Sequence, residues 1–438
     1  MAKKVNVGLI GYGTVGKGTA EVLLKNKEII FENTGINVIL KTVADLAIDT
    51  KNPDELIKKC KVTNDAMDII NDPEIDIVVE LIGGYTVAKD FILKALNSKK
   101  HVVSANKALF ALHGTELYQA ADYNNVNICF EGAVGGGIPI IRVLKEDLAG
   151  NNIKEIFGII NGTANYILSR MEKEGKEFED VLKIAQEKGY AEADPTFDIE
   201  GIDTAHKIAI LASIGFNTLI PFEKIYVEGI SSIKQMDIEF AKKLDCRIKL
   251  LAIAKKHEDD IEVRVHPTMV PDVELMAQVD GVFNAVEIVG DMVDKTMHYG
   301  RGAGGRPTGS AVVGDVISLA RDIAAGCAKR TPILGFKKEY TYYYPIKDIK
   351  DIMSAFYLRF SVVDEPGTLA TIAGILAKYG ISISEAMQPD ERDPGEAVSM
   401  VFMTHKTIGR KIFAALEEID KCDVVRDKTV AIRVKELV

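Results

Sequence analysis

A glycine-rich turn near the start of the chain restricts the fold more than any other feature of the sequence. Gly11, Gly13 and Gly16 form a GxGxxG pattern directly after the apolar run KVNVGLIGYG and before TVGKGTAEVLLKNKEIIF, which has helical spacing. A strand, a tight glycine turn and a helix in this order place free main-chain N–H groups where a pyrophosphate can bind. The pattern therefore predicts a dinucleotide-binding turn, and the alternative is an ordinary glycine turn.

The segments that follow alternate between strand and helix patterns. We expect strands in NVILKTVAD, IDIVVELIG, HVVSAN and NVNICF, and helices in NPDELIKKC and TVAKDFILKALNSKK. Alternating β and α units indicate a parallel sheet with helices on both faces. The fold class predicted for residues 1–130 is therefore α/β, a Rossmann-type, doubly wound parallel sheet.

Two further units are predicted downstream. Residues 131–300 mix helices with the strands IKLLAIAKK, IEVRVHPTMV and NAVEIVGD, which suggests an α+β domain with a second sheet. Residues 301–340 open with a glycine-rich turn and a long helix, which we expect to pack back on the first domain. After a linker at 341–355, residues 356–438 follow the order βαββαβ, the ferredoxin-like arrangement.

Composition limits the possible functions. The chain has 438 residues, of which 47% are hydrophobic and 27% charged, and its net charge is −10. This acidic balance argues against nucleic-acid binding, which needs a basic surplus. We also expect no membrane span, since no apolar run reaches the required length. The start of the chain has no signal-peptide pattern, and the cysteines show no close pair, which favours a reducing cytoplasm. They are Cys60, Cys129, Cys246, Cys327 and Cys422.

The stretch EADPTFDIEGIDTAHK concentrates acidic residues in front of one lysine. Asp203 and Lys207 are four residues apart on a predicted helix, so they share a face beside its apolar stripe. A surface ion pair worth less than about 1 kcal/mol would look the same. However, a lysine that is partly withdrawn from water and held by carboxylates can donate a proton to a carbonyl oxygen.

A second lysine and one aspartate follow predicted parallel strands. Lys107 lies just after HVVSAN, at the strand end where ligands bind in open α/β sheets, although strand-end lysines are usually only solvated. Asp45 follows the second strand, where a carboxylate can accept from the adenosine ribose and disfavour a 2′-phosphate. No arginine stands beside it. We therefore favour NAD and leave NADP open.

Six separated motifs, in this order, resemble those of the homoserine dehydrogenase family. They are GLIGYGTVGKG, VSANKALF, FEGAVGGGIPII, IINGTANYIL, EADPTFDIEGIDTAHK and GAGGRPTGSAVVGD, and they extend from residue 1 to about 340. The tail resembles an ACT domain, an amino-acid-sensing module, through VVDEPGTLATIAGILAKYGISI. The resemblance implies the monofunctional, regulated form of the enzyme, in which 131–300 is a catalytic and dimerisation domain.

The resemblance also implies a reaction and roles for particular residues. The reaction is hydride transfer between NAD(P)H and L-aspartate 4-semialdehyde, which gives L-homoserine for threonine, methionine and isoleucine biosynthesis. Lys207 would be the proton donor, Lys107 would orient the substrate, and Glu192, Asp198 and Asp203 would bind the amino group and position Lys207. The implied cofactor contacts are Gly11, Gly13, Thr14, Val15, Gly16, Asp45, Gly83, Ser104, Lys107 and Gly302.

Two further sites are implied. A sodium-type cation would be held by Glu131 and the main-chain oxygens of Val134, Gly136 and Ile138. A flexible interdomain hinge is the alternative explanation of these glycines. In the tail, Asp364, Gly367 and Thr368 lie at a strand-to-helix turn that can receive an amino-acid carboxylate. ACT units usually pair, so we expect a homo-oligomer, a dimer or tetramer, inhibited by threonine; an ACT unit that only dimerises is the alternative.

Three features test this interpretation against its rivals. His206 turns to a different face of the helix from Lys207, so we interpret it as structural. No cysteine has the setting of an acyl-forming nucleophile, which counts against an aspartate-semialdehyde dehydrogenase. A non-catalytic, dinucleotide-binding amino-acid sensor would not need Lys107, Lys207 and their acids together, yet it remains the alternative function.

Overall fold

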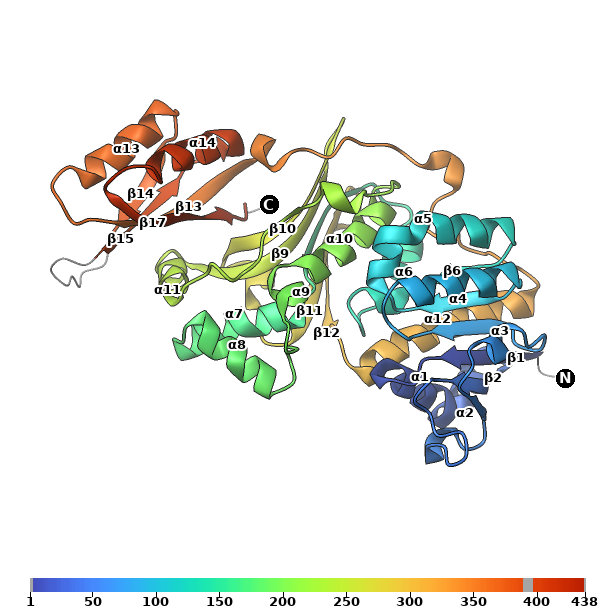
Figure 1. Cartoon of the computed structure of the whole chain (residues 1–438). Helices are drawn as coiled ribbons and strands as arrows, with labels where there is room; N and C mark the ends of the chain where they lie inside the picture. The colour runs from blue at the N-terminus through green and yellow to red at the C-terminus, as the bar shows by residue number, and fades with distance from the viewer. Residues whose placement is uncertain (1–2, 389–396, 437–438) are drawn as a thin grey trace.

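The computed structural model describes residues 3–388 and 397–436 of the chain. Its N-terminal part contains a six-stranded sheet in the order β3-β2-β1-β4-β5-β6, in which every pairing is parallel (Figure 1). This order, which reverses direction between β1 and β4, confirms the predicted doubly wound sheet. The strands are β1 (Lys3–Ile10), β2 (Ile36–Ala44), β3 (Lys61–Thr63), β4 (Ile77–Glu80), β5 (His101–Ser104) and β6 (Ile128–Cys129).

The helices of this part differ from the predicted ones in four places, one of which is the short helix α3, which was not predicted. The first predicted helix is two helices that meet at Asn26, and NPDELIKKC forms only the 3₁₀ turn η1 (Glu55–Ile57), so that prediction was wrong. A long helix after β5 was not predicted. The helices are α1 (Thr14–Lys25), α2 (Lys27–Thr34), α3 (Met67–Ile70), α4 (Thr86–Asn97) and α5 (Lys107–Tyr123).

Helix α12 (Gly305–Ala325) lies against this first sheet although it is far away in sequence (Figure 1). Val312, Val316 and Leu319 of α12 share a core with the strands β1 and β2. Two glycines let α12 approach α1 closely: a Cβ on Gly18 would lie 2.0 Å from the Gly305 oxygen, and one on Gly309 would lie 2.6 Å from the Gly18 carbonyl carbon.

The second sheet is continuous through the rest of the molecule. Its main path runs β12-β11-β7-β9-β10-β17-β13-β15-β14, so strands of the tail extend the sheet of the middle domain. The junction is a short parallel pairing of β10 with β17, at Thr268 with Arg433 and Met269 with Val434. The middle strands are β7 (Ile153–Ile159), β8 (Tyr226–Val227), β9 (Cys246–Lys256), β10 (Ile261–Pro271), β11 (Phe283–Gly290) and β12 (Asp294–Arg301).

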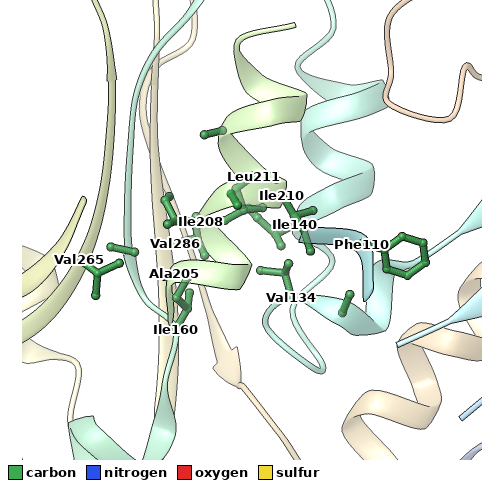
Figure 2. Close-up of a cluster of buried hydrophobic side chains, with 14 of the residues drawn as sticks. Phe110, Val134, Ile140, Ile160, Ala205, Ile208, Ile210, Leu211, Val265 and Val286 are labelled. Atoms are coloured by element: carbon green, nitrogen blue, oxygen red, sulfur yellow. The ribbon is translucent and has the colours of Figure 1, made fainter. Parts of the chain in front are cut away.

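Helix α10 (Ile202–Gly215) connects the two halves of the molecule. Every residue from Asp203 to Ile214 is buried, because the helix is enclosed between the second sheet and the N-terminal part. Figure 2 shows Ile208 and Leu211 among Val265 and Val286 on the sheet side, and Val134 and Ile140 on the other side. The other middle helices are α6 (Ile140–Arg142), which continues as the π turn η3 (Val143–Asp147), α7 (Gly162–Glu174), α8 (Phe178–Glu187), α9 (Thr196–Ile199) and α11 (Gln235–Lys243).

The tail confirms the predicted βαββαβ order and adds a short strand. It comprises β13 (Met353–Val362), α13 (Thr368–Lys378), β14 (Ile383–Met387), β15 (Val398–Thr404), β16 (Thr407–Ile408), α14 (Gly409–Ile419) and β17 (Val425–Val434). Both helices lie on one side of the strands (Figure 1). Among the described residues, no helix is long and apolar enough to cross a membrane.

Candidate active site

The glycine turn has the geometry that dinucleotide binding requires. Gly11 has φ +97°, and a Cβ there would lie 2.6 Å from the Leu81 carbonyl carbon, while a Cβ on Gly16 would lie 2.0 Å from the Gly11 oxygen. Both positions therefore need glycine for the turn and for close helix–strand packing. A Cβ on Gly13 would meet no atom within 4 Å, so this position leaves space above the start of α1.

Asp45 is held by the main chain at the end of β2. Its Oδ2 accepts a hydrogen bond from Tyr12 N at 2.7 Å, and its Oδ1 accepts one from Ala47 N at 2.8 Å. The carboxylate thus stabilises the conformation of the glycine turn through its hydrogen bond to Tyr12 N. Each oxygen keeps a second lone pair with which it could accept from a ribose hydroxyl.

The glycine-rich loop of residues 300–305 lies against the GxGxxG turn of residues 11–16. A Cβ on Gly305 would lie 2.6 Å from the Thr14 oxygen, and a Cβ on Gly136 would lie 2.5 Å from the Gly302 oxygen. A Cβ on Gly302 itself would lie 1.0 Å from Asn284 Oδ1, so no other residue fits there. The predicted cofactor residues Gly11, Thr14 and Gly302 therefore belong to one contiguous region.

A cavity of about 430 Å³ opens at the carboxyl ends of β4 and β5. Three of the predicted cofactor residues, Val15, Gly83 and Lys107, line it. Phe197 and His206 from the α9–α10 region close its other side, so the cavity joins the dinucleotide-binding part to the polar cluster. Ser104 lies beneath this surface, fully buried, and its hydroxyl donates to Glu80 Oε2 at 2.7 Å.

At the centre of the polar cluster, Asp203 pairs with both predicted lysines. Lys207 Nζ donates to Asp203 Oδ2 at 2.6 Å and to the Ile160 oxygen at 2.6 Å, while Lys107 Nζ pairs with Asp203 Oδ1 at 2.9 Å. Only 2% of Asp203 and 8% of Lys207 are exposed, but the Lys107 side chain is 37% exposed. The pair of Asp203 and Lys207 is therefore not a solvated surface ion pair.

Burial and charge shift the pKa values of the two lysines in opposite directions. Burial lowers the pKa of Lys207 below its ordinary value, and Asp203 offsets only part of this. For Lys107 the effect of burial is outweighed by Asp203, which raises its pKa. Burial alone would raise the pKa of Asp203, but the two lysines hold it well below its usual range. These opposite pKa shifts suit Lys207 to exchange a proton and Lys107 to remain a fixed positive charge.

The other predicted acids lie around this centre. Asn161 donates to Asp198 Oδ1 at 2.7 Å and to Asp203 Oδ2 at 2.9 Å, so it links the two carboxylates. Glu192 is exposed, but it is close enough to raise the pKa of Lys107 together with Asp198. Asn161 was not predicted as a site residue, although it lies in the motif IINGTANYIL, where it caps helix α7.

His206 is buried among aromatic rings. Its ring stacks on Phe222, with centroids 4.4 Å apart, and is tilted against Phe197 at 5.4 Å. Burial lowers its pKa to about 4, so it is neutral at physiological pH. Lys107 Nζ lies 5.9 Å from the Phe197 ring centroid, and Phe197 is a second site residue that was not predicted from the sequence.

Glu80 and Asn106 organise the mouth of the cavity and were also not predicted. Glu80 is 1% exposed, and it accepts from Ser104 Oγ and, at 2.8 Å, from Ile82 N. Burial raises its pKa. Asn106 caps α5 by accepting from Leu109 N, and its amide donates to the Gly84 oxygen. Its place directly before Lys107 is the only sign of this role in the sequence.

The predicted cation loop lies beside the glycine loops. Both carboxylate oxygens of Glu131 accept from main-chain N–H groups, of Ile141 and Arg142, at 2.8 Å each. Asp315 Oδ2 accepts from Glu131 N and its other oxygen pairs with Arg142. Burial, and then Asp315, raises the pKa of Glu131 to about 7. Among the described residues, no three His, Cys, Asp or Glu side chains gather as a metal site.

The predicted regulatory turn starts helix α13. Gly367, with φ +101°, is the N-cap, and the buried Thr368 donates its hydroxyl to the Val363 oxygen at 3.1 Å. Asp364 immediately precedes this turn. Together they form the strand-to-helix turn that the sequence predicts.

Comparison with known proteins follows the same division of the chain. Residues 139–317 match the family described as homoserine dehydrogenase, 11–131 match the homoserine dehydrogenase NAD-binding domain, and 356–424 match the ACT domain. A homoserine dehydrogenase from Pseudomonas aeruginosa is 45% identical over 99% of this chain and 100% of its own.

Solved structures agree with this result. The crystal structure of a homoserine dehydrogenase from Thiobacillus denitrificans has a TM-score of 0.93 and 44% identity, covering 99% of both chains. A hyperthermophilic archaeal homoserine dehydrogenase in complex with NADPH has a TM-score of 0.62 and 27% identity, over 72% of this chain and 97% of that one.

Proposed function

The chain belongs to the homoserine dehydrogenase family, and on this basis we propose how its residues divide the work of the reaction. It is an NAD(P)-dependent oxidoreductase that interconverts L-homoserine and L-aspartate 4-semialdehyde. When bound, NAD(P) supplies the nicotinamide that accepts or returns the hydride. The protein must orient the substrate, exclude water and move one proton.

Lys207 exchanges the proton with the substrate oxygen, as donor in one direction and as acceptor in the other. The observation that carries it is the buried triad in which Asp203 holds the ammonium of Lys207 at 2.6 Å. Because burial lowers the pKa of Lys207, its ammonium is a stronger acid than an exposed lysine. In the reducing direction Lys207 gives its proton to the aldehyde oxygen, and in the oxidising direction its free amine takes the hydroxyl proton.

Lys107, Asp198 and Glu192 hold the substrate. Lys107 remains charged, since Asp203 raises its pKa, and its partly exposed ammonium faces the cavity as a fixed positive group. It suits a substrate carboxylate or carbonyl oxygen. Asp198 and Glu192 add negative charge for the substrate's amino group, and Asn161 keeps Asp198 aligned with Asp203.

We propose NAD as the preferred cofactor, with NADP as the alternative. The Asp45 carboxylate at the end of β2 favours a free ribose hydroxyl over a 2′-phosphate. NADP remains the alternative because one homologous dehydrogenase is known in complex with NADPH. The proposed contacts are the glycine turn with Thr14 and Val15, together with Gly83, Lys107 and Gly302. Ser104 is fully buried and would act through Glu80, to which it donates, and not by direct contact.

A monovalent, sodium-type cation is proposed at the loop of residues 131–138. The carboxylates of Glu131 and Asp315 are buried side by side, and burial raises the pKa of both, so a bound cation would stabilise their charged forms. The glycines expose main-chain oxygens, which are hard ligands. The cation would be held by Glu131, Val134, Gly136 and Ile138, and it would fix the loop against Gly302.

Regulation by threonine is proposed through the ACT domain, at the turn of Asp364, Gly367 and Thr368. Such control requires different affinities for threonine in two arrangements of the domain. We also propose a homo-oligomer, a dimer or tetramer, and a cytoplasmic location in threonine, methionine and isoleucine biosynthesis. The location is supported by the five cysteines, all of which are free.

The experiment that tests the function is dinucleotide reduction by the purified protein with L-homoserine. NAD and NADP are used separately, with and without threonine, and wild type is compared with Lys207→Ala. The proposal expects reduction in wild type that is lost in the variant, while dinucleotide still binds. Reduction that survives in Lys207→Ala would contradict the role of Lys207, and no reduction with bound dinucleotide would instead favour an amino-acid sensor.

A further inference from the structure

A second large cavity, of about 460 Å³, lies at the junction between the middle domain and the ACT domain. Glu262, Arg264, His266 and Thr268 of β10 line it, and these alternate residues point to one face of the strand. Their neighbours Val263 and Val265 point to the other face, where both join the hydrophobic core. Figure 2 shows Val265 beside helix α10. The cavity is therefore on the opposite side of β10 from the candidate active site.

Both domains contribute charges to this cavity. Arg264 and Glu262 belong to the middle domain, Arg433 to β17 of the ACT domain, and Glu155 to β7. Arg264 is 7% exposed and Arg433 is 4% exposed, so both guanidinium groups are withdrawn from water. Burial lowers the pKa of Arg264 to about 10 even with Glu262 beside it, and burial, then Arg433 and Arg264, lowers the pKa of His266.

Several of these buried polar atoms have no hydrogen-bond partner. On the cationic side they are Arg264 Nε and Nη1, Arg433 Nη2 and Lys435 Nζ, and on the anionic side they are Glu262 Oε2, Glu155 Oε2 and Asp351 Oδ1. The nearest charged contact of Glu262 Oε2 is Arg264 Nη2, at 3.3 Å, without hydrogen-bond geometry. Leaving one buried polar atom unsatisfied costs about 1–3 kcal/mol, and more for a charged group. A cluster of them in one cavity offers hydrogen-bonding groups of both signs to a polar ligand.

From this arrangement we propose that the cavity is a binding site for a zwitterionic α-amino acid. The ligand carboxylate pairs with Arg264 and Arg433, and the ligand ammonium pairs with Glu262 and Glu155. Glu262 Oε1 already pairs with His257 Nε2 at 2.8 Å, and Glu155 Oε1 pairs with Lys255 Nζ at 3.2 Å. A simple anion such as phosphate would satisfy the guanidinium groups but would leave the other oxygen of each carboxylate, Glu262 Oε2 and Glu155 Oε2, without a partner. A ligand that carries both charges on neighbouring atoms satisfies the two sides together.

This site is distinct from the turn at Gly367, and its position couples it to the active site. A ligand that joins Arg264 to Arg433 bridges β10 and β17 at the seam where the two domains share one sheet. On the other face of β10, a Cβ on Gly201 would lie 3.1 Å from Val265 Cγ1, and Gly201 is the N-cap of α10, which carries Asp203 and Lys207. Binding therefore acts on the strand that supports the catalytic helix.

The test is isothermal titration calorimetry of the full chain with each of the twenty protein amino acids and with inorganic phosphate. Because binding is measured directly, the result does not depend on catalytic activity. The expected result is saturable binding of at least one amino acid, weakened at least about tenfold in Arg264→Gln and in Glu262→Gln, since each charged hydrogen bond is worth about 1.5–3 kcal/mol. The matched control is Arg426→Gln, an exposed arginine on the same strand as Arg433.

Two further measurements keep the test decisive if a buried variant fails to fold. Ser354→Met fills the cavity without removing a lining charge, and it is expected to abolish binding while dinucleotide affinity stays unchanged; because Ser354 is buried, its melting temperature is measured to confirm folding. Absence of any binding by wild type overturns the proposal, as does a panel in which no amino acid loses affinity in Ser354→Met; binding that persists in this variant is assigned to the active site or the Gly367 turn. Phosphate binding that Glu262→Gln does not affect would overturn the zwitterionic class.

Discussion

The carboxylate of Asp237 on α11 accepts two hydrogen bonds from the guanidinium of Arg359 on β13, at 2.6 and 3.1 Å. Both side chains are buried, and Tyr357 completes the set by donating its hydroxyl to the same carboxylate at 2.8 Å. Since α11 belongs to the middle domain and β13 to the ACT domain, this pair fixes the angle between the two.

The first prediction concerns this interdomain pair. Arg359→Met leaves Asp237 as an uncompensated buried charge, and we expect the docking of the ACT domain to lose about 3–5 kcal/mol. Catalysis without effector should persist, because the pair is not part of the candidate active site. Limited proteolysis of the segment 341–352 measures this, and the double variant Asp237→Leu with Arg359→Leu is the control that should recover resistance. A single variant as resistant as wild type would contradict the structural role.

The second prediction concerns Lys207. Lys207→Gln should reduce kcat by about 10²–10⁴-fold, the usual contribution of a positioned proton-transfer group. Dinucleotide affinity should stay within about twofold, because Lys207 does not line the cofactor turn. Steady-state kinetics and fluorescence titration measure the two quantities. Lys183→Gln, on the surface helix α8, is the control. Equal loss of cofactor binding would point to misfolding instead.

The third prediction is a pH dependence with a defined sign. Homoserine oxidation requires the free amine of Lys207, so its rate should rise with pH through the lowered pKa of this group. Reduction of the aldehyde requires the ammonium, so its rate should fall over the same range. Asp203 raises the pKa of Lys207; therefore Asp203→Asn should move both limbs to lower pH. Limbs that do not move in Asp203→Asn would rule out this assignment.

The fourth prediction uses the tight contact at Gly302. Gly302→Ala places a methyl group on Asn284 Oδ1 and should cost about 1–3 kcal/mol of folding stability, together with most dinucleotide affinity. Adding Asn284→Ala removes the two closest atoms and should restore part of both losses. Thermal unfolding and dinucleotide titration of the single and double variants measure this. No rescue in the double variant would show that the loop fails for another reason.

The fifth prediction concerns Glu80. Glu80→Leu leaves the Ser104 hydroxyl and Ile82 N without their acceptor at the cavity floor, and we expect a stability loss of about 1–3 kcal/mol. Glu80→Gln keeps one acceptor oxygen for Ile82 N and can donate its amide to the Ser104 hydroxyl, which rotates to accept, so it should be closer to wild type than Glu80→Leu. The comparison, by thermal unfolding and by KM for dinucleotide, separates hydrogen bonding from charge. A large defect in Glu80→Gln would show that the charge itself is needed.

Local patterns in the sequence predicted the main features of the fold. The GxGxxG turn, the strand runs of the first sheet and the βαββαβ order of the tail are each encoded within short segments. Helix α5 was not predicted, because it begins at the motif that contains Lys107 and its hydrophobic pattern is weak. NPDELIKKC was wrongly predicted as a helix, since charged residues and Pro53 leave it without a buried face.

The candidate site was predictable where its residues are close in sequence. Asp203 and Lys207 are one helical turn apart, so their pairing follows from spacing alone. Lys107 is almost a hundred residues away, and only the folded chain brings it to the same carboxylate. The unpaired groups of the second cavity are less accessible still to sequence reasoning, because Arg264 and Arg433 look like ordinary strand arginines.

The seam between β10 and β17 also has a consequence for how the molecule is made. β17 follows every other described strand in the sequence, yet it lies between β10 and β13 in the sheet. During synthesis the dinucleotide-binding part and most of the middle domain emerge first and begin to fold while β17 is still inside the ribosome. The sheet of the ACT domain can be completed, and can pair with β10 of the middle domain, only after β17 has emerged. A nascent chain is therefore expected to hold a formed catalytic helix before it holds any means of control.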